Sequence, residues 1–159
     1  MAEAFTELQE LSNLLNEHSD KLNAAIDCAN QRLAKMNLGV PAWLGKPIVY
    51  SEPVQSTLEM SGVEEPTIVR TGTEFGYCRV GGKWQLAVRD VLLYHETSDD
   101  DRAYERAAPP EEPIPLLNAS REVRASAVQH LPQLLKILKE KAAELLENIR
   151  QAEMRATKL

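Results

Sequence analysis

The sequence predicts an α+β fold in which a long helix at each end of the chain flanks a small antiparallel β-sheet. Three observations predict it: heptad-spaced apolar residues near both termini, strand-like alternation in the middle, and a Gly81-Gly82 pair between two strand patterns. A chain of 159 residues is long enough to bury its own apolar core. We therefore expect residues 1–159 to form a single α+β domain.

The first helix is predicted to run from about Ala4 to Asn37, where Gly39 and then Pro41 supply a stop. Apolar residues recur in it mostly in steps of three and four, which returns their side chains to one stripe of a helix. This row consists of Leu8, Leu11, Leu15, Leu22, Ile26, Ala29, Leu33 and Met36.

Strands are expected after this helix. Ile48–Tyr50 and Val54–Met60 read as short strands or extended chain. Pro47 and Pro53 precede them and confine them to sheet edges, because proline lacks the backbone donor that a central strand needs.

A β-hairpin is the clearest local signal in the sequence. Thr73–Val80 and Lys83–Leu92 both read as strands, and Gly81-Gly82 between them is a preferred two-residue hairpin turn. This turn fixes the register, so that Glu74 opposes Arg89 on one face of the hairpin. The other face then receives the large apolar residues Phe75, Tyr77, Trp84, Leu86 and Val88.

Residues 96–115 differ in character from the strands before them. They contain Asp99–Asp101, Pro109-Pro110 and Glu111-Glu112, with few apolar residues to anchor them. We expect an acidic, proline-rich mobile loop over 96–115.

The last helix is predicted to begin near Asn118 or Ser120, either of which can cap it. Pro132 lies inside it, removes one backbone hydrogen bond and predicts a kink. We expect this long kinked C-terminal helix to pack antiparallel on the first helix. Its apolar row consists of Val128, Leu131, Leu135, Leu138, Ala142, Leu145, Ile149 and Ala152.

The order of helix, strands and helix is similar in layout to the prefoldin family, in which two coiled-coil arms flank hairpins. The resemblance is one of layout. Pro132 and the long middle segment depart from the family's pattern, so no residue role follows from it.

The distribution of charge indicates where partners can bind. The net charge of −6 disfavours nucleic acid as a partner. Residues 1–45 carry three basic and six acidic groups, whereas residues 119–159 carry eight basic and five acidic groups. These opposite signs suit helices that lie against each other, within one chain or between chains.

We expect a cytoplasmic protein without a membrane partner. No apolar run approaches the roughly 20 residues that span a bilayer, and acidic residues stand where a secretory signal would be positive. Cys28 and Cys78 are expected to be free thiols, because they are far apart and have no short CxxC spacing. With three scattered histidines they make no zinc pattern, so we expect no metal and no cofactor.

The absence of catalytic motifs favours a protein that is not an enzyme. The sequence contains no GxGxxG, GxxxxGK[ST], HExxH or GxSxG motif, and Gly81-Gly82-Lys83 is followed by a strand rather than a helix. His95, Glu96 and Asp99–Asp101 form the densest group of acid–base or hard-metal side chains. A solvated acidic loop explains this group better than a metal or catalytic site.

The leading functional hypothesis is a non-enzymatic, oligomeric interaction protein: an adaptor, regulator or assembly subunit. It rests on the two apolar rows, which form seams that each need a partner helix. The expected partners are a second copy of the chain, as a homodimer or higher oligomer, and another protein. The interface residues expected on the seams are Leu8, Leu15, Leu22, Leu131, Leu135, Leu138, Leu145 and Ile149.

The alternative hypothesis is a module that binds a small ligand or an anion, with weak enzymatic chemistry as an open extension. Basic side chains in the first turn of the last helix lie unfavourably at the positive end of the helix dipole. Either the acidic segment upstream or an external anion can compensate for their charge. The hairpin contributes aromatic and basic groups nearby. The expected ligand-binding residues are Arg79, Trp84, His95, Arg121 and Arg124.

Overall fold

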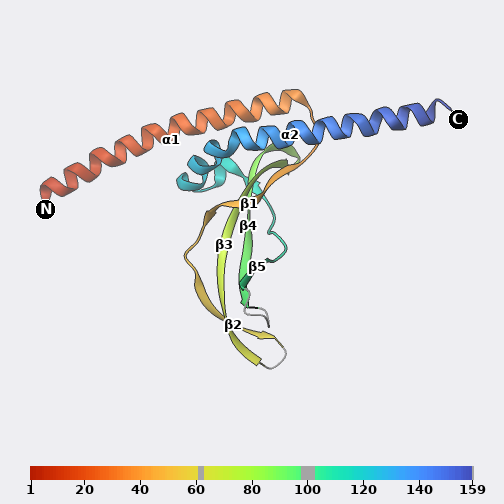
Figure 1. The fold of residues 1–159 in the computed structure, drawn as a ribbon. Coiled ribbons are helices and arrows are strands. Elements are labelled where there is room, and N and C mark those ends of the chain that lie inside the picture. The colour runs from red at the N-terminus through yellow and green to blue at the C-terminus, as the bar shows by residue number, and fades with distance from the viewer. Residues whose placement is uncertain (61–62, 98–102, 159) are drawn as a thin grey trace.

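The computed structural model describes residues 1–60, 63–97 and 103–158 and has the α+β fold that the sequence predicts. Figure 1 shows two long helices lying along one end of a curled, half-barrel sheet. The elements are α1 (Ala2–Met36), β1 (Ala42–Tyr50), β2 (Val54–Met60), β3 (Val63–Val80), β4 (Lys83–Thr97), β5 (Ala103–Ala107), β6 (Ile114–Pro115), the 3₁₀ turn η1 (Leu116–Asn118) and α2 (Arg121–Ala156).

The two long strands β3 and β4 form the middle of the sheet, and all its strand pairs are antiparallel. Each of these two strands pairs with two shorter strands in succession along its outer edge. β1 and β2 pair with β3, whereas β6 and β5 pair with β4. The predicted hairpin is therefore the centre of a larger sheet.

The hairpin has the register that the sequence predicts. Val80 opposes Lys83 and Glu74 opposes Arg89. Gly81 and Gly82 both have positive φ, of 57° and 81°, which a two-residue turn of this hand requires and which glycine adopts without strain. The predicted apolar face is buried, except that Trp84 keeps part of its surface accessible.

The core lies between this face of the sheet and the two helices. α1 and α2 each place a row of side chains on the sheet, and η1 closes one side with Leu116. The buried members of this cluster are Ile26, Leu33, Ala42, Leu44, Phe75, Tyr77, Leu86, Val88, Leu116, Ala127, Leu134 and Leu138.

The other face of the sheet holds a smaller packed group built on Gly76. The guanidinium of Arg89 lies 3.9 Å from the centre of the Trp43 ring, and its Nε is 2.8 Å from Glu74 Oε2. A Cβ on Gly76 would lie 2.5 Å from both the Ala42 carbonyl oxygen and the Trp43 ring. Gly76 is therefore required for the close approach of β1 to β3.

The predicted antiparallel packing of the two helices is wrong, because they run in the same direction. Arg121, at the start of α2, donates to Asn16 in the first half of α1, and Leu131 lines a groove with Leu33 further along both helices. A short loop forces consecutive helices antiparallel. Here six strands separate the two helices, so the connection does not force α2 to run antiparallel to α1. The turn η1 places the start of α2 beside α1.

Helix α2 is continuous through Pro132, in agreement with the expectation of one helix rather than two. Ser120 is its N-cap and its Oγ accepts from the backbone N–H of Val123 at 3.3 Å. The kink at Pro132 stays a prediction.

Strands β5 and β6 lie within residues 96–115, where we expected a loop. Between them the backbone N–H of Ala108 donates to Leu92 and that of Glu111 donates to Asp90, both at 2.9 Å. The segment thus follows the edge of β4 from 103 to 115. The expected mobility of this segment stays a prediction, and Asp99–Asp101 lie outside the described residues.

Among the helices in the described part of the chain, we find none that combines the length and the apolar character needed to cross a bilayer.

We predict that Gly76→Ala lowers the free energy of unfolding by about 1–3 kcal/mol, because the new methyl group has no space against β1. Urea denaturation measures this change. Trp43→Ala removes one of the two obstacles, so the double variant should lose less stability than the sum of the two single variants. Strict additivity would contradict the close approach.

Candidate functional site

The five predicted ligand-binding residues do not form one site. Arg79 and Trp84 oppose each other at the turn end of the hairpin, whereas His95 lies near the far end of β4. Arg121 and Arg124 open α2. The structure thus distributes these residues over three regions, of which the hairpin end is the one with a large cavity.

The two arginines of α2 make contacts within the chain. Arg121 Nη2 donates to Asn16 Oδ1 at 2.7 Å, and Arg124 Nη1 donates to the Leu117 carbonyl oxygen at 3.1 Å. Arg124 Nε is buried without a hydrogen-bond partner. These contacts tie the start of α2 to α1 and to η1, which gives both residues a role in the fold.

His95 lies beside an ion pair at the edge formed by β5. Arg70 Nη2 is 2.7 Å from Glu105 Oε2, and the Arg70 guanidinium also lies 4.1 Å from the centre of the Tyr50 ring. The cavity that His95 lines has a volume of about 250 Å³. Arg70 already has a carboxylate and an aromatic ring as partners, so its charge needs no external ligand to balance it.

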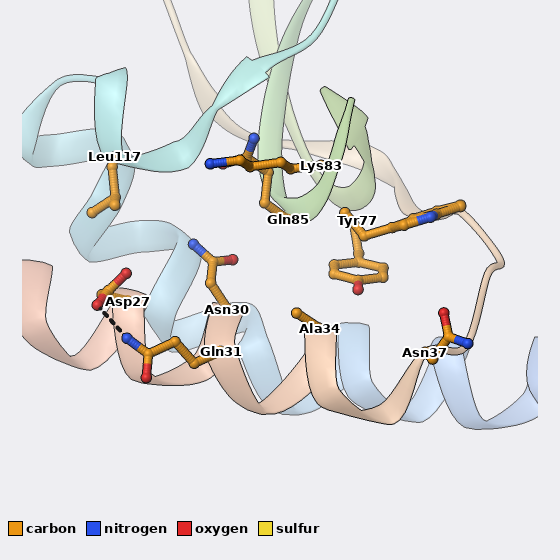
Figure 2. A pocket seen from close by; sticks show the side chains of 10 residues that line it. Asp27, Asn30, Gln31, Ala34, Asn37, Tyr77, Lys83, Gln85 and Leu117 are labelled. Atoms are coloured by element: carbon orange, nitrogen blue, oxygen red, sulfur yellow. Dashed lines mark hydrogen bonds between the residues drawn. The ribbon is translucent and has the colours of Figure 1, made fainter. Parts of the chain in front are cut away.

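A larger cavity, of about 480 Å³, lies between α1 and the hairpin, and we call it the hairpin pocket. In Figure 2 the side chains of α1 line one side of it and those of β3 and β4 the other. The hairpin pocket is lined by Asp27, Asn30, Gln31, Ala34, Asn37, Tyr77, Lys83, Trp84, Gln85 and Leu117.

Hydrogen bonds fix three amide side chains around the hairpin pocket. Asn30 Oδ1 accepts from the backbone N–H of Leu86 at 2.8 Å, and Gln31 Nε2 donates to Asp27 Oδ2 at 2.8 Å. Gln85 Nε2 donates to the Val80 carbonyl oxygen at 3.1 Å. These three side chains are therefore held by contacts within the chain.

The aromatic side of the pocket is a stacked pair. The ring centres of Tyr77 and Trp84 are 5.6 Å apart and their planes differ by 25°. Tyr77 is 1% exposed, and burial raises the pKa of its phenol above the ordinary value of 10.0. At neutral pH this side of the pocket is uncharged.

The predicted seam residues divide into two groups. Leu138 is buried in the core of its own chain, and Leu22 and Leu131 pack partly against that core. The other five are exposed: Leu8, Leu15, Leu135, Leu145 and Ile149.

Most of the exposed seam residues lie where the helices extend beyond the sheet. We call residues 2–15 the N-terminal arm and residues 142–156 the C-terminal arm; Figure 1 shows them extending in opposite directions. The arms carry further exposed apolar side chains: Phe5, Leu11 and Leu14 on the first, and Leu146 and Met154 on the second.

A groove between α1 and α2 lies between the two arms. It has a volume of about 400 Å³ and an apolar lining that includes Cys28, Leu131 and Leu135. Cys28 is exposed, whereas Cys78 is buried in the sheet, where burial raises the pKa of its thiol and Arg89 partly offsets this.

Within the residues that the structure describes, there is no group of three or more His, Cys, Asp or Glu side chains that could hold a metal ion. The comparisons with family models, with curated proteins and with solved structures find no match for this chain. A functional assignment therefore depends on the geometry of the arms and the hairpin pocket.

The sequence pattern identified Trp84 but not its neighbours on α1. Asp27, Asn30 and Gln31 lie on what reads as the solvated side of an amphipathic helix. Their role emerges only when the hairpin is placed beside that side of α1. No local signal marks this placement in the sequence.

We predict that the protein loses stability above about pH 10 through Tyr77. The pKa of this phenol is raised in the folded state, so the unfolded chain ionises first, and the free energy of unfolding falls as the pH passes 10.0. Urea denaturation between pH 8 and pH 11 measures the slope. Tyr77→Phe should reduce the slope. Equal slopes for wild type and Tyr77→Phe would contradict the prediction.

Proposed function

We propose that this chain is a non-enzymatic, cytoplasmic interaction protein that associates with a second copy of itself through its helical arms. One observation carries the proposal: each terminal helix extends beyond the sheet and leaves a row of large apolar side chains in water. Such rows are the seams of helix–helix pairs. An adaptor or assembly subunit of this kind acts through the surface that its dimer presents.

The exposed apolar rows support self-association. Leu8 and Leu15 on the N-terminal arm are 60% and 57% exposed, and Ile149 on the C-terminal arm is 46% exposed. Burial of apolar surface contributes about 25 cal/mol per Å², so covering both arms favours association.

A second copy fits both arms at once. The two helices run in the same direction and overlap in the middle, so their arms extend from opposite ends of the overlap. A two-fold axis across the overlap places the N-terminal arm of one chain beside the C-terminal arm of the other, antiparallel. The same operation pairs the two remaining arms, so the dimer closes.

The lengths and the charges of the arms support this crossed pairing. Each arm is about 20 Å long at 1.5 Å per residue. Their free ends meet in the crossed dimer, which brings the acidic first turn of α1, with Glu3, next to the basic last turn of α2, with Arg155. Opposite charges and antiparallel helix dipoles both favour this contact.

Pairing of like arms covers less of the apolar surface. A two-fold axis through the N-terminal arms leaves both C-terminal arms in water. A two-fold axis through the C-terminal arms likewise leaves both N-terminal arms in water. Crossed pairing thus covers more apolar surface in one closed dimer. The two sheets stay uncovered and can contact another protein.

We predict that the wild-type protein elutes as a dimer of the 17.8 kDa chain in size-exclusion chromatography with light scattering. Leu8→Glu and Leu145→Glu should each give monomers, because a carboxylate in an apolar seam loses its hydration. Asn13→Glu and Gln151→Glu place the same charge on exposed sides of the two arms that face away from their leucine rows, and both variants should stay dimeric. A monomeric wild-type protein would contradict self-association.

Mixing the two monomeric variants tests the crossed arrangement. A mixed dimer of Leu8→Glu with Leu145→Glu places both changes in one arm pair and leaves the other pair intact. We predict that mixing restores a dimer, with a Kd weaker than that of wild type. Failure to restore it, with both variants folded by circular dichroism, would contradict crossed pairing, whereas a dimer in either single variant alone would favour pairing of like arms.

A further inference from the structure

The groove between α1 and α2 is apolar and only partly covered by its own chain. Leu33 is buried in the core and Leu131 packs partly against it, so these two residues form the floor of the groove. Met36 and Leu135 also line the groove and are 61% and 42% exposed. Two adjacent helices therefore leave a shared apolar surface in water.

The shape of this groove suits a third helix. Its lining on α1 extends from Ala25 to Met36, which is about 16 Å at 1.5 Å per residue. Ala25 and Ala29 have short side chains, so another helix can approach α1 closely there. The volume of about 400 Å³ accommodates apolar side chains that project from one stripe of such a helix.

Basic side chains surround the groove, although the chain as a whole is acidic. Arg32 lines the groove itself. Lys35 follows the groove residue Cys28 by seven positions, which places it on the same side of α1. Lys139 follows the groove residue Leu135 by four positions, which places it on the same side of α2.

No acidic residue in the same helix segments balances these charges. Residues 28–36 and 125–139 contain four lysine or arginine residues and no aspartate or glutamate. Among the ion pairs of the described residues, none includes Arg32, Lys35 or Lys139. In a chain with a net charge of −6, this is a local excess of positive charge, and an acidic partner is complementary to it.

We propose that the groove between α1 and α2 binds an acidic amphipathic helix of another protein. The apolar stripe of that helix lies on Leu33 and Leu131, and carboxylates beside the stripe lie near Arg32, Lys35 and Lys139. This is the helix-in-groove mode of recognition with charge complementarity added. The inference rests on the proposed interaction role and names the partner of a surface to which neither arm contributes a residue.

The N-terminal arm of a second copy is the competing occupant. It is itself an acidic amphipathic helix, with three glutamates and no lysine or arginine over residues 2–15. In the crossed dimer, however, this arm already lies against the C-terminal arm of the other copy. The groove then stays free for a different protein.

Fluorescence anisotropy with a labelled peptide of about 14 residues, or four helical turns, tests the proposal. The peptide has leucines at every third and fourth position and glutamates beside them. A matched basic peptide has lysine in place of each glutamate. We expect saturable binding of the acidic peptide to the full chain, and at least about tenfold weaker binding of the basic peptide.

Variants of exposed groove residues separate recognition from folding. A chain with both Arg32→Glu and Lys139→Glu should lose the preference for the acidic peptide, whereas Lys46→Glu, at an exposed lysine on β1, should keep it. Leu135→Glu should raise the Kd of the acidic peptide by about tenfold or more. Gln133→Glu adds the same charge at an exposed position of α2 outside the groove and should leave this Kd unchanged. Circular dichroism checks that each variant is folded.

Three results would overturn the proposal. They are no saturable binding of the acidic peptide, equal affinity for the acidic and basic peptides, and an unchanged Kd in Leu135→Glu. Much tighter binding of the acidic peptide to Leu8→Glu than to the wild-type dimer would show that the arm of a second copy fills the groove, and would overturn the assignment to another protein. We expect equal binding by wild type and Leu8→Glu. A wild-type monomer that binds the acidic peptide would contradict self-association and leave this inference standing.

Discussion

The pairing of β3 with β4 through Gly81 and Gly82 determines where every other element lies. Both glycines have positive φ, and the two-residue turn that they form allows one register. That register places Tyr77 and Leu86 toward the helices and Glu74 with Arg89 on the other face. A slip by one residue would exchange the two faces and remove both the helix-facing core and the contact that holds β1.

Asn30 connects this sheet to α1 and prepares the hairpin pocket at the same time. Strand β6 pairs with β4 only at Ala87 and Val88, so the N–H of the preceding Leu86 lies just past the end of that pairing. Asn30 Oδ1 accepts from it at 2.8 Å, which satisfies a donor that would otherwise lie unpaired at a sheet edge. The same side chain therefore lines the pocket and completes the hydrogen bonding of the strand.

The hairpin and the helices could be predicted because their signals are local. The glycine pair and the alternation around it determine a register, and apolar spacing determines a helix. The direction of α2 and the pairing of β5 and β6 depend on contacts between residues far apart in the chain. The charged and proline-rich composition of residues 96–115 gives no strand pattern that predicts this pairing. The strict heptad spacing also selected the wrong leucine at one position. It predicts Leu135 on the buried side, whereas Leu134 is buried with Leu138, because a straight helix has 3.6 residues per turn rather than 3.5.

Helix α1 contributes residues both to the hairpin pocket and to the exposed N-terminal arm. Its last turns place Asp27, Asn30 and Gln31 toward the hairpin, while Cys28 lines the groove toward α2. Its first turns form an arm with no contact to the sheet. Trp84 was found from the sequence because it is a large aromatic residue next to the hairpin turn, but its polar neighbours on α1 resemble a solvated helix face. A binding surface assembled from two elements is recognisable only when both are in place, whereas an apolar arm is visible in one element alone.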